Sequence, residues 1–131
     1  VLHRNHLGCM TGVAVALTTQ PTTIDLTQAA TTVFGMQARK TVDGAHPASV
    51  LWAGDVNGDG RILYTGADND RDPILEAVGG VVPTSTIEGY HNEDVNLDGT
   101  VKYTGDNNDR DIILQNVGGV VPTNVQVGQL P

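Results

Sequence analysis

The sequence predicts an α+β fold in which an incomplete, β-sandwich-like region precedes a pseudo-twofold pair of loop–helix units. Residues 1–54 are rich in Thr and Val and poor in charge. Residues 55–84 then repeat at residues 94–123, a constant offset of 39, with 21 of 30 positions identical. Of the 15 acidic side chains in this 131-residue chain of net charge -8, 13 lie between residues 55 and 111. We therefore expect two regions, residues 1–54 and residues 55–131.

The first region contains five short segments that read as β-strands separated by turns. Their β-branched residues favour extended backbone. The segments are "TGVAVAL", "TTIDLT", "TTVFG", "ARKTV" and "SVLW". A β-sandwich needs about seven strands in roughly 100 residues. Five strands in 54 residues therefore predict a sheet with an open edge, which could accept a strand from another chain.

The second region is a tandem duplication. Set in register, "DVNGDGRILYTGADNDRDPILEAVGGVVPT" faces "DVNLDGTVKYTGDNNDRDIILQNVGGVVPT". Two copies are too few for a solenoid, whose repeats bury a continuous core by stacking. We expect the copies to pack face to face about a pseudo-twofold axis.

Each copy opens with a pattern typical of a calcium-binding loop. Calcium takes six to eight oxygen ligands, and an EF-hand-like loop supplies them from alternate residues, with Gly at the sixth position and a backbone carbonyl at the seventh. Positions 1, 3, 5 and 7 are Asp55, Asn57, Asp59 and Arg61 in the first copy, and Asp94, Asn96, Asp98 and Thr100 in the second. Position 8 holds Ile62 or Val101, which we expect to pair in a small sheet between the loops.

The twelfth loop position should supply a bidentate carboxylate, but the first copy has Gly66 there. The segment "NDRD" restores the required spacing, since it puts an acid three residues after an Asn that can cap a helix. We therefore expect an 18-residue loop closed by Asp72, with Asp111 in the second copy, and two bound calcium ions. The alternative assigns this role to Asp70 and Asp109, with Asp72 and Asp111 as helix caps.

A two-turn helix follows each loop. Its apolar residues recur on one side, and a Gly ends it. These residues are Ile74, Leu75 and Val78 in the first copy and Ile113, Leu114 and Val117 in the second, with Gly79 and Gly118 as stops. Helices this short are unstable alone in water, so they need the metal and each other.

At "DVNGDG" and "DVNLDG" the chain resembles type I dockerins, secreted modules built from duplicated calcium loop–helix units. It is also similar to a C-terminal module of secreted Bacteroidota proteins through "LHRNHLG", "LWAGDVNGDG" and "EDVNLDGTVKYTG". The second resemblance spans nearly the whole chain. It implies secretion and display at the cell surface, and it implies no particular chemistry.

Several functions are disfavoured by composition. An acidic chain with a pI near 4.6 is a poor partner for nucleic acid, and no apolar run approaches the eighteen residues of a membrane span. Cys9 is the only cysteine, so we expect a semi-buried thiol. The four histidines, His3, His6, His46 and His91, suit packing and turn hydrogen bonds better than a zinc site. Common catalytic motifs are absent, so we do not expect an enzyme, and a fragment of a carbohydrate-active enzyme is the least favoured reading.

We therefore expect a secreted, non-enzymatic, calcium-stabilised structural module. The tail "TNVQVGQLP" alternates Val125 and Val127 with polar residues, and the first copy shows no matching strand in its sequence. We expect this tail to complete the sheet of a neighbouring subunit, head to tail, giving an extracellular fibre. The alternative is a dockerin-like module that docks onto another secreted protein. The stretch "TTQPTTIDLTQAATT" could carry O-linked glycans.

Overall fold

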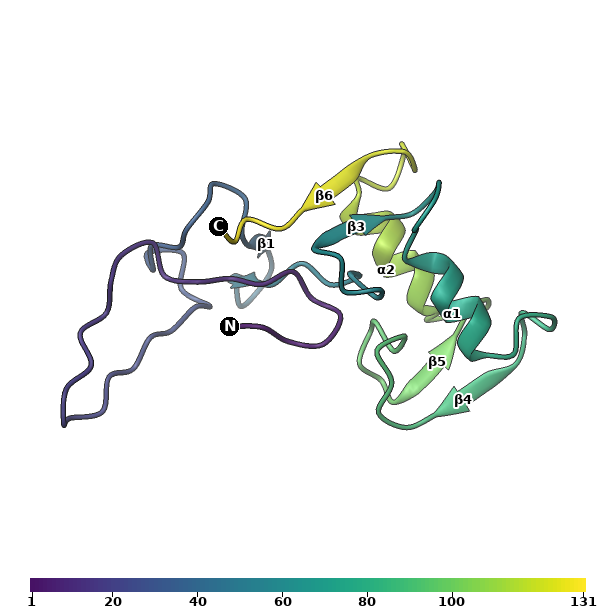
Figure 1. Ribbon diagram of the computed structural model, residues 1–131, viewed down its shortest axis with the longest axis horizontal. Helices are drawn as coiled ribbons and strands as arrows, with labels where there is room; N and C mark the ends of the chain where they lie inside the picture. Colours follow the sequence, from purple (N-terminus) through teal and green to yellow (C-terminus); the bar gives the residue numbers. More distant parts are fainter.

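The computed structural model describes all of residues 1–131 and is a small α+β fold (Figure 1). Two short helices and six three-residue strands are present, and the strands form three two-stranded antiparallel sheets. The elements in chain order are β1 Lys40–Val42, β2 Ala48–Val50, β3 Arg61–Leu63, α1 Arg71–Ala77, β4 Thr86–Glu88, β5 Thr100–Lys102, α2 Asp109–Asn116 and β6 Val125–Val127. Neither helix is long and apolar enough to cross a membrane.

The strands of the duplicated region are exchanged between the two copies. Strand β3 of the first loop pairs with β6, which follows the second helix, and Ile62 lies opposite Gln126. Strand β5 of the second loop pairs with β4, which follows the first helix, and Ile87 lies opposite Val101. The expectation that Ile62 and Val101 pair with each other was therefore wrong, because each loop strand pairs with the segment that leaves the other copy's helix.

The exchange also corrects the interpretation of the tail. Strand β4 is the counterpart of β6 at the offset of 39, so the first copy does have a matching strand. Only Gly89 and Gly128 are identical between these two segments, which is why the sequence comparison missed it. The tail strand is paired within its own chain. It also turns its polar residue inward: Gln126 is half-buried, whereas Val125 and Val127 are exposed.

One hydrophobic core holds the duplicated region together. Helices α1 and α2 contact each other, α1 also contacts β5, and α2 contacts both β3 and β5. Eight of the nine core residues form four pairs at the offset of 39, and the ninth comes from the first region. The pairs are Val56 with Val95, Ile62 with Val101, Ile74 with Ile113 and Val78 with Val117, and the ninth residue is Leu7. Equivalent side chains of the two copies therefore lie in one shared core.

The helices run as the sequence predicted. Ile74, Val78 and their equivalents in α2 are buried, while Leu75 and Leu114 are half-buried against the same core. Val78 ends α1, and Gly79 follows in a left-handed conformation with φ of 105°. This conformation is easily reached by Gly and terminates helices.

The first region forms much less regular structure than predicted. Its regular strands are β1, within "ARKTV", and β2, which overlaps only the first two residues of "SVLW". Residues 11–17, 22–27 and 31–35 form no strand, apart from an isolated bridge between Thr11 and Val33. Without a second layer, the extended segments have nothing to pack on, as the 97% exposure of Leu17 and the 99% exposure of Met36 show. The β-sandwich-like prediction was wrong for these segments.

The first region is nevertheless fastened to the duplicated region. Leu7 enters the core, and its N–H donates to the Trp52 carbonyl at 2.8 Å. Asn116 of α2 donates to the Ala53 carbonyl at 2.7 Å and accepts from Lys40 Nζ at 2.8 Å. Most of residues 9–36 instead form a long loop that extends away from the helices (Figure 1).

Candidate metal-binding loops

The first loop, residues 55–72, is curled by hydrogen bonds from its own side chains. Asn57 Oδ1 accepts the Asp59 N–H at 2.9 Å, and Asp59 Oδ1 accepts the Arg61 N–H at 2.9 Å. The Gly60 N–H donates to Asp55 Oδ2 at 3.1 Å, and Gly60 has a φ of 82°. These turns direct alternate side-chain oxygens into the loop, as the sequence pattern predicted.

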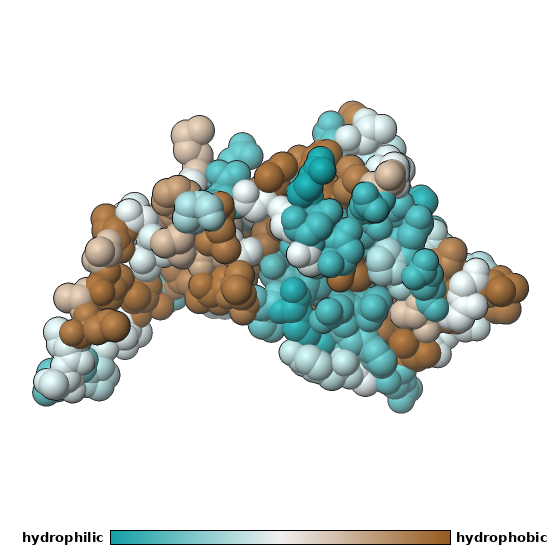
Figure 2. All heavy atoms as spheres, in the orientation of Figure 1, coloured by the Kyte–Doolittle hydropathy of each residue, from teal (hydrophilic) through white to brown (hydrophobic).

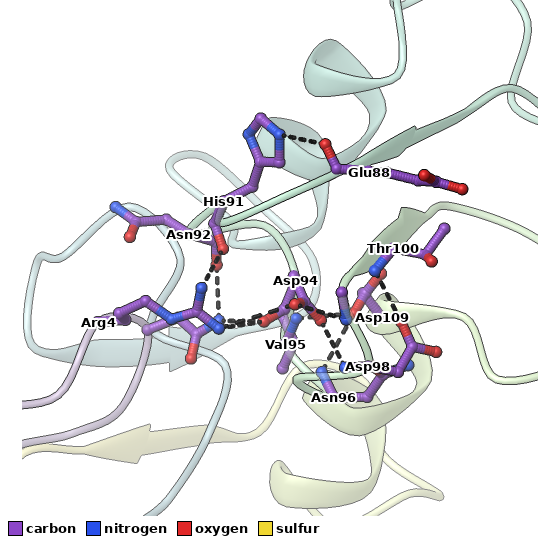
Figure 3. Close-up of polar contacts among 12 residues, drawn as sticks. Arg4, Glu88, His91, Asn92, Asp94, Val95, Asn96, Asp98, Thr100 and Asp109 are labelled. Carbon is purple, nitrogen blue, oxygen red and sulfur yellow. Dashed lines mark hydrogen bonds and ion pairs between the residues drawn. The ribbon is translucent and has the colours of Figure 1, made fainter.

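The second loop, residues 94–111, repeats these turns (Figure 3). Asn96 Oδ1 accepts the Asp98 N–H at 2.8 Å, and Asp98 Oδ1 accepts the Thr100 N–H at 2.9 Å. The Gly99 N–H donates to Asp94 Oδ2 at 3.1 Å. One difference appears at the first position, where Asp94 Oδ1 also accepts the Asp98 N–H at 3.1 Å.

Asp70 and Asp109 are completely buried and brace the loops from inside. Asp70 Oδ1 accepts the N–H groups of Val56 at 2.8 Å and Asn57 at 3.2 Å, and its Oδ2 accepts that of Leu63 at 2.8 Å. Asp109 makes the same contacts, at 2.7, 3.1 and 2.7 Å, with Val95, Asn96 and Lys102. Each carboxylate thus ties the start of its loop to the following strand.

Burial shifts the ionisation of these two carboxyl groups. It raises the pKa of Asp70 to about 6, with a smaller contribution from the charge of Asp55, while the three N–H donors act in the opposite direction. Burial likewise raises the pKa of Asp109. Both groups therefore depend on their hydrogen bonds to remain charged inside the loop.

Asp72 and Asp111 lie in the first helical turns and are about half exposed, with side-chain exposures of 55% and 52%. Asn69 caps α1, since its Oδ1 accepts the Asp72 N–H at 3.1 Å and its Nδ2 donates to Asp72 Oδ2 at 2.8 Å. Asn108 makes the same two bonds with Asp111. The Asp111 side chain lines one cavity together with Asn96 and Asp98.

The residues inserted around "YTG" fold back over each loop and reach the other copy. Asn57 Nδ2 donates to the Asp68 carbonyl at 2.8 Å, which holds the insertion against the loop. Thr65 Oγ1 donates to the Pro122 carbonyl at 3.1 Å, and Thr104 Oγ1 donates to the Pro83 carbonyl at 2.9 Å. The insertion therefore links the two copies, a role the sequence analysis did not assign to it.

One oxygen of the first loop lacks any hydrogen-bond partner. Asp55 is 7% exposed, and its Oδ1 atom is buried and unpaired, whereas its Oδ2 is bonded to Gly60. Burial raises the pKa of the Asp55 carboxyl and the nearby charge of Asp59 raises it further, while the N–H groups of Gly60, Gly58 and Asp59 act in the opposite direction. A buried anionic oxygen without a partner is unfavourable unless a cation or donor reaches it.

No three carboxylate, imidazole or thiol side chains lie close enough to hold a metal ion by themselves. The oxygens that the sequence predicts as donors in each loop include three carboxylates, which do not gather into such a group in this structure: Asp55, Asp59 and Asp72 in the first loop, and Asp94, Asp98 and Asp111 in the second. The other predicted donors are the amide oxygen of Asn57 or Asn96 and the backbone carbonyl of Arg61 or Thr100. An all-oxygen set of this kind matches a hard cation such as calcium.

The histidines do not gather in the structure. His3 and His6 form a pair with their Nδ1 atoms 3.3 Å apart, while His46 is exposed and His91 contacts the Glu88 carbonyl at 3.2 Å. Burial, followed by the charges of His3 and Arg4, lowers the pKa of His6 to about 4. Cys9 is buried and makes no disulfide.

Sequence reasoning missed Arg4 and Asn5, which reach the second loop from the opposite end of the chain. The segment "HRNHLG" stood out only through a family resemblance, because nothing local indicates a contact across almost 90 residues.

Comparison of the chain with protein-family models, curated proteins and solved structures finds no match.

Proposed function

We propose that this protein binds two calcium ions, one in each loop, and that the ions stiffen a non-enzymatic structural module. The observation that carries the proposal is the buried, unpaired Oδ1 of Asp55. It belongs to a loop whose other side-chain oxygens are already held by turn hydrogen bonds. A bound cation would satisfy this oxygen and offset the repulsion between neighbouring carboxylates.

The proposed donors follow the EF-hand-like, dockerin-like pattern. We assign the closing carboxylate to Asp72 and Asp111, because Asp70 and Asp109 already accept three N–H groups each. The shared cavity of Asn96, Asp98 and Asp111 supports this choice in the second loop. The first donor set is Asp55, Asn57, Asp59, the Arg61 carbonyl and Asp72, and the second is Asp94, Asn96, Asp98, the Thr100 carbonyl and Asp111.

Calcium titration of the full chain by calorimetry tests the proposal. We expect two ions per chain, and one ion per chain in each of the variants Asp59→Ala and Asp98→Ala. No heat and no binding at millimolar calcium, with the chain folded, would refute it.

Two further variants distinguish the carboxylate proposed to bind calcium, Asp72, from the buried carboxylate that holds the loop together, Asp70. Asp72→Asn should weaken calcium binding while leaving the chelator-treated protein as stable as before, because its side chain is half exposed. Asp70→Asn should lower stability even in chelator, because an amide cannot accept all three N–H groups. The reverse result would make Asp70 the ligand.

The proposed role is extracellular, where millimolar calcium would fill sites of modest affinity. A secreted, surface-exposed module agrees with the family resemblance of "LHRNHLG" and "LWAGDVNGDG".

We also propose self-association through β6 as a second function. Strand β6 has β3 as its only neighbour in the sheet, and it exposes 38% of Val125 and 48% of Val127. An open strand edge bearing exposed valines favours strand addition by a second copy. In this form of the fibre hypothesis the tail strand stays in its own sheet and offers its free edge.

Light scattering on the purified chain, with the variant Val127→Lys beside it, tests self-association. Oligomers of the wild type that disappear in Val127→Lys support it, and a monomer at all concentrations contradicts it. A dockerin-like module would instead stay monomeric until a foreign receptor is added.

A further inference from the structure

The two loops meet at a single residue of the first region. Asn5 is completely buried, and its backbone carbonyl accepts the N–H groups of Gly54 at 2.7 Å and Asp55 at 3.0 Å. Its side-chain amide donates to the carbonyls of Asn92 at 2.6 Å and Asp94 at 2.9 Å. Asn5 therefore contacts the first residue of both loops.

The neighbouring Arg4 side chain makes its hydrogen bonds and its ion pair at the second loop (Figure 3), and it also lines a cavity together with Asp55 of the first loop. Its Nη1 donates to the His91 carbonyl at 3.1 Å, and its Nη2 lies 3.5 Å from the Asp94 carbonyl and 3.8 Å from Asp94 Oδ2. The guanidinium also stacks on Tyr90, 4.1 Å from the ring centroid, and the side chain is only 9% exposed. Arg4 is thus an enclosed cation fixed beside the first carboxylate of the second loop.

The first loop has no equivalent. Asp55 takes part in none of the ion pairs of the structure, and its Oδ1 has no partner. Asp94, by contrast, accepts from Gly99 and Asp98 and faces the Arg4 guanidinium. Two loops with nearly the same donor sequence therefore differ in the charge environment of their first ligand.

We infer that Arg4 is a built-in counter-cation of the second loop, which makes the two loops unequal calcium sites. This inference rests on the proposed calcium binding. The guanidinium neutralises part of the negative charge that would attract calcium to the second loop, and it repels the incoming ion across a partly dehydrated space. Asp55 of the first loop forms no ion pair with Arg4, so the first loop binds calcium more tightly and fills first.

Arg4 reaches this position because Asn5 anchors the segment on both loops. The Arg4 backbone has a φ of 26°, outside the conformations that non-glycine residues usually adopt. The contacts of Asn5 hold the chain in this conformation, and the guanidinium is thereby presented to Asp94.

Calcium titrations of single-loop variants test the inference. Asp59→Ala leaves the second loop to be measured alone, and Asp98→Ala leaves the first. We expect the Asp98→Ala chain to bind calcium about tenfold more tightly than the Asp59→Ala chain, given the size of a partly screened charge interaction. This comparison needs no change at Arg4.

Arg4→Gln is then added to each background. It should tighten binding about tenfold in Asp59→Ala and have a much smaller effect in Asp98→Ala, because the guanidinium forms an ion pair with Asp94 and none with Asp55. Arg4→Lys retains the charge and should preserve the weak site. Arg39→Gln, which removes a positive charge bonded to Leu26 and Thr31, serves as the net-charge control and should change neither loop.

Equal affinities of the two loops, or an equal gain in both backgrounds on Arg4→Gln, would overturn this inference alone. A loss of second-loop affinity on Arg4→Gln would also overturn it, since Arg4 would then act as a structural support. Absence of calcium binding from both folded backgrounds would overturn the calcium proposal itself.

Discussion

The duplicated region and residues 1–54 differ in how they bury their apolar side chains. In the duplicated region, four pairs of equivalent apolar side chains meet in one core. In residues 1–54 the buried apolar side chains are Leu7, Cys9 and Ala38, and Leu7 belongs to the core of the other region. Duplication guarantees a complementary partner for each apolar face, whereas a single set of extended segments has none.

The surface reflects this difference. Hydrophobic residues gather over the first region, and hydrophilic ones over the loops and helices (Figure 2). The carbonyls of Leu26, Gln28 and Thr31 accept from one side chain, Arg39, which organises that part of the chain without a core. The comparison suggests that the duplicated region provides most of the stability and that the first region depends on its attachment points.

Among the changes that test this difference between the two regions, calcium removal is expected to have the largest effect on the free energy of unfolding. Each site at a thousandfold excess over its Kd adds about 4 kcal/mol to the free energy of unfolding. Chelation should therefore lower the Tm by roughly 10 °C or more, and calcium should restore it. Calorimetry with and without EDTA measures this, and an unchanged Tm would show that the fold does not use the metal.

The second-largest effect on the free energy of unfolding is expected from truncating a core residue of the duplicated region. Ile74→Ala should lower the free energy of unfolding by about 2–5 kcal/mol, because Ile74 is fully buried in the core that it shares with its equivalent in α2. Met36→Ala, at a residue that is 99% exposed in the first region, should change it by less than about 0.5 kcal/mol. Denaturant unfolding measures both, and similar losses would mean that the first region has packing of its own.

The helix caps test whether the copies contribute equally. Asn69→Ala and Asn108→Ala each remove an oxygen that accepts the N–H of the residue three positions later. Each should lower the free energy of unfolding by about 1 kcal/mol. A clear difference between the two, in chelator, would show that the two loop–helix units do not contribute equally to stability.

The smallest effect on the free energy of unfolding is expected from pH, through His6 in the segment that attaches the first region. The pKa of His6 in the folded chain is about 4, below its ordinary value of 6.5, so between these values the unfolded chain binds more protons. The His6 contribution to stability should therefore decline as the pH falls from about 6.5 towards 4, whereas Asp70, whose pKa is raised from 3.8 to about 6, contributes in the opposite direction between those two values. His6 is half-buried near His3 and Arg4, so solvent reduces the size of this decline.

Comparison of the unfolding free energies of His6→Gln and His46→Gln across this pH range isolates the effect. His46 is exposed, so its replacement should leave the slope unchanged, while His6→Gln should flatten it. The same slope in both variants would assign the pH dependence to the carboxylates of the loops.

The parts that could be predicted from the sequence are those encoded within a few residues. The turns of "DVNGDG" form through hydrogen bonds two to five residues apart, and the Asn69 cap acts three residues away. The helices and their Gly stops follow from a local apolar pattern. Because both copies carry the same apolar pattern, it was also predictable that their equivalent apolar residues share one core.

Other features depend on contacts between distant segments that share no sequence pattern. The exchange pairs β4 with β5 and β6 with β3, and the counterpart strands β4 and β6 have no residue in common, so the duplication did not reveal them. The tail valines Val125 and Val127 are exposed, and the residue half-buried in β6 is Gln126. The β-propensity of residues 11–35 produced no strands, because strand formation needs a partner layer that is not there.

The sequence by itself determined the duplicated loop–helix units and their apolar faces, because hydrogen bonds and side-chain periodicity act over a few residues. The oxygen donors that it names remain a prediction. Only the tertiary structure decided that Asn5 joins both loops and that Arg4 forms an ion pair with Asp94 and none with Asp55. Identical local sequences cannot encode that difference. It arises because a single segment of the first region meets two similar loops and pairs its guanidinium with the first carboxylate of only one of them.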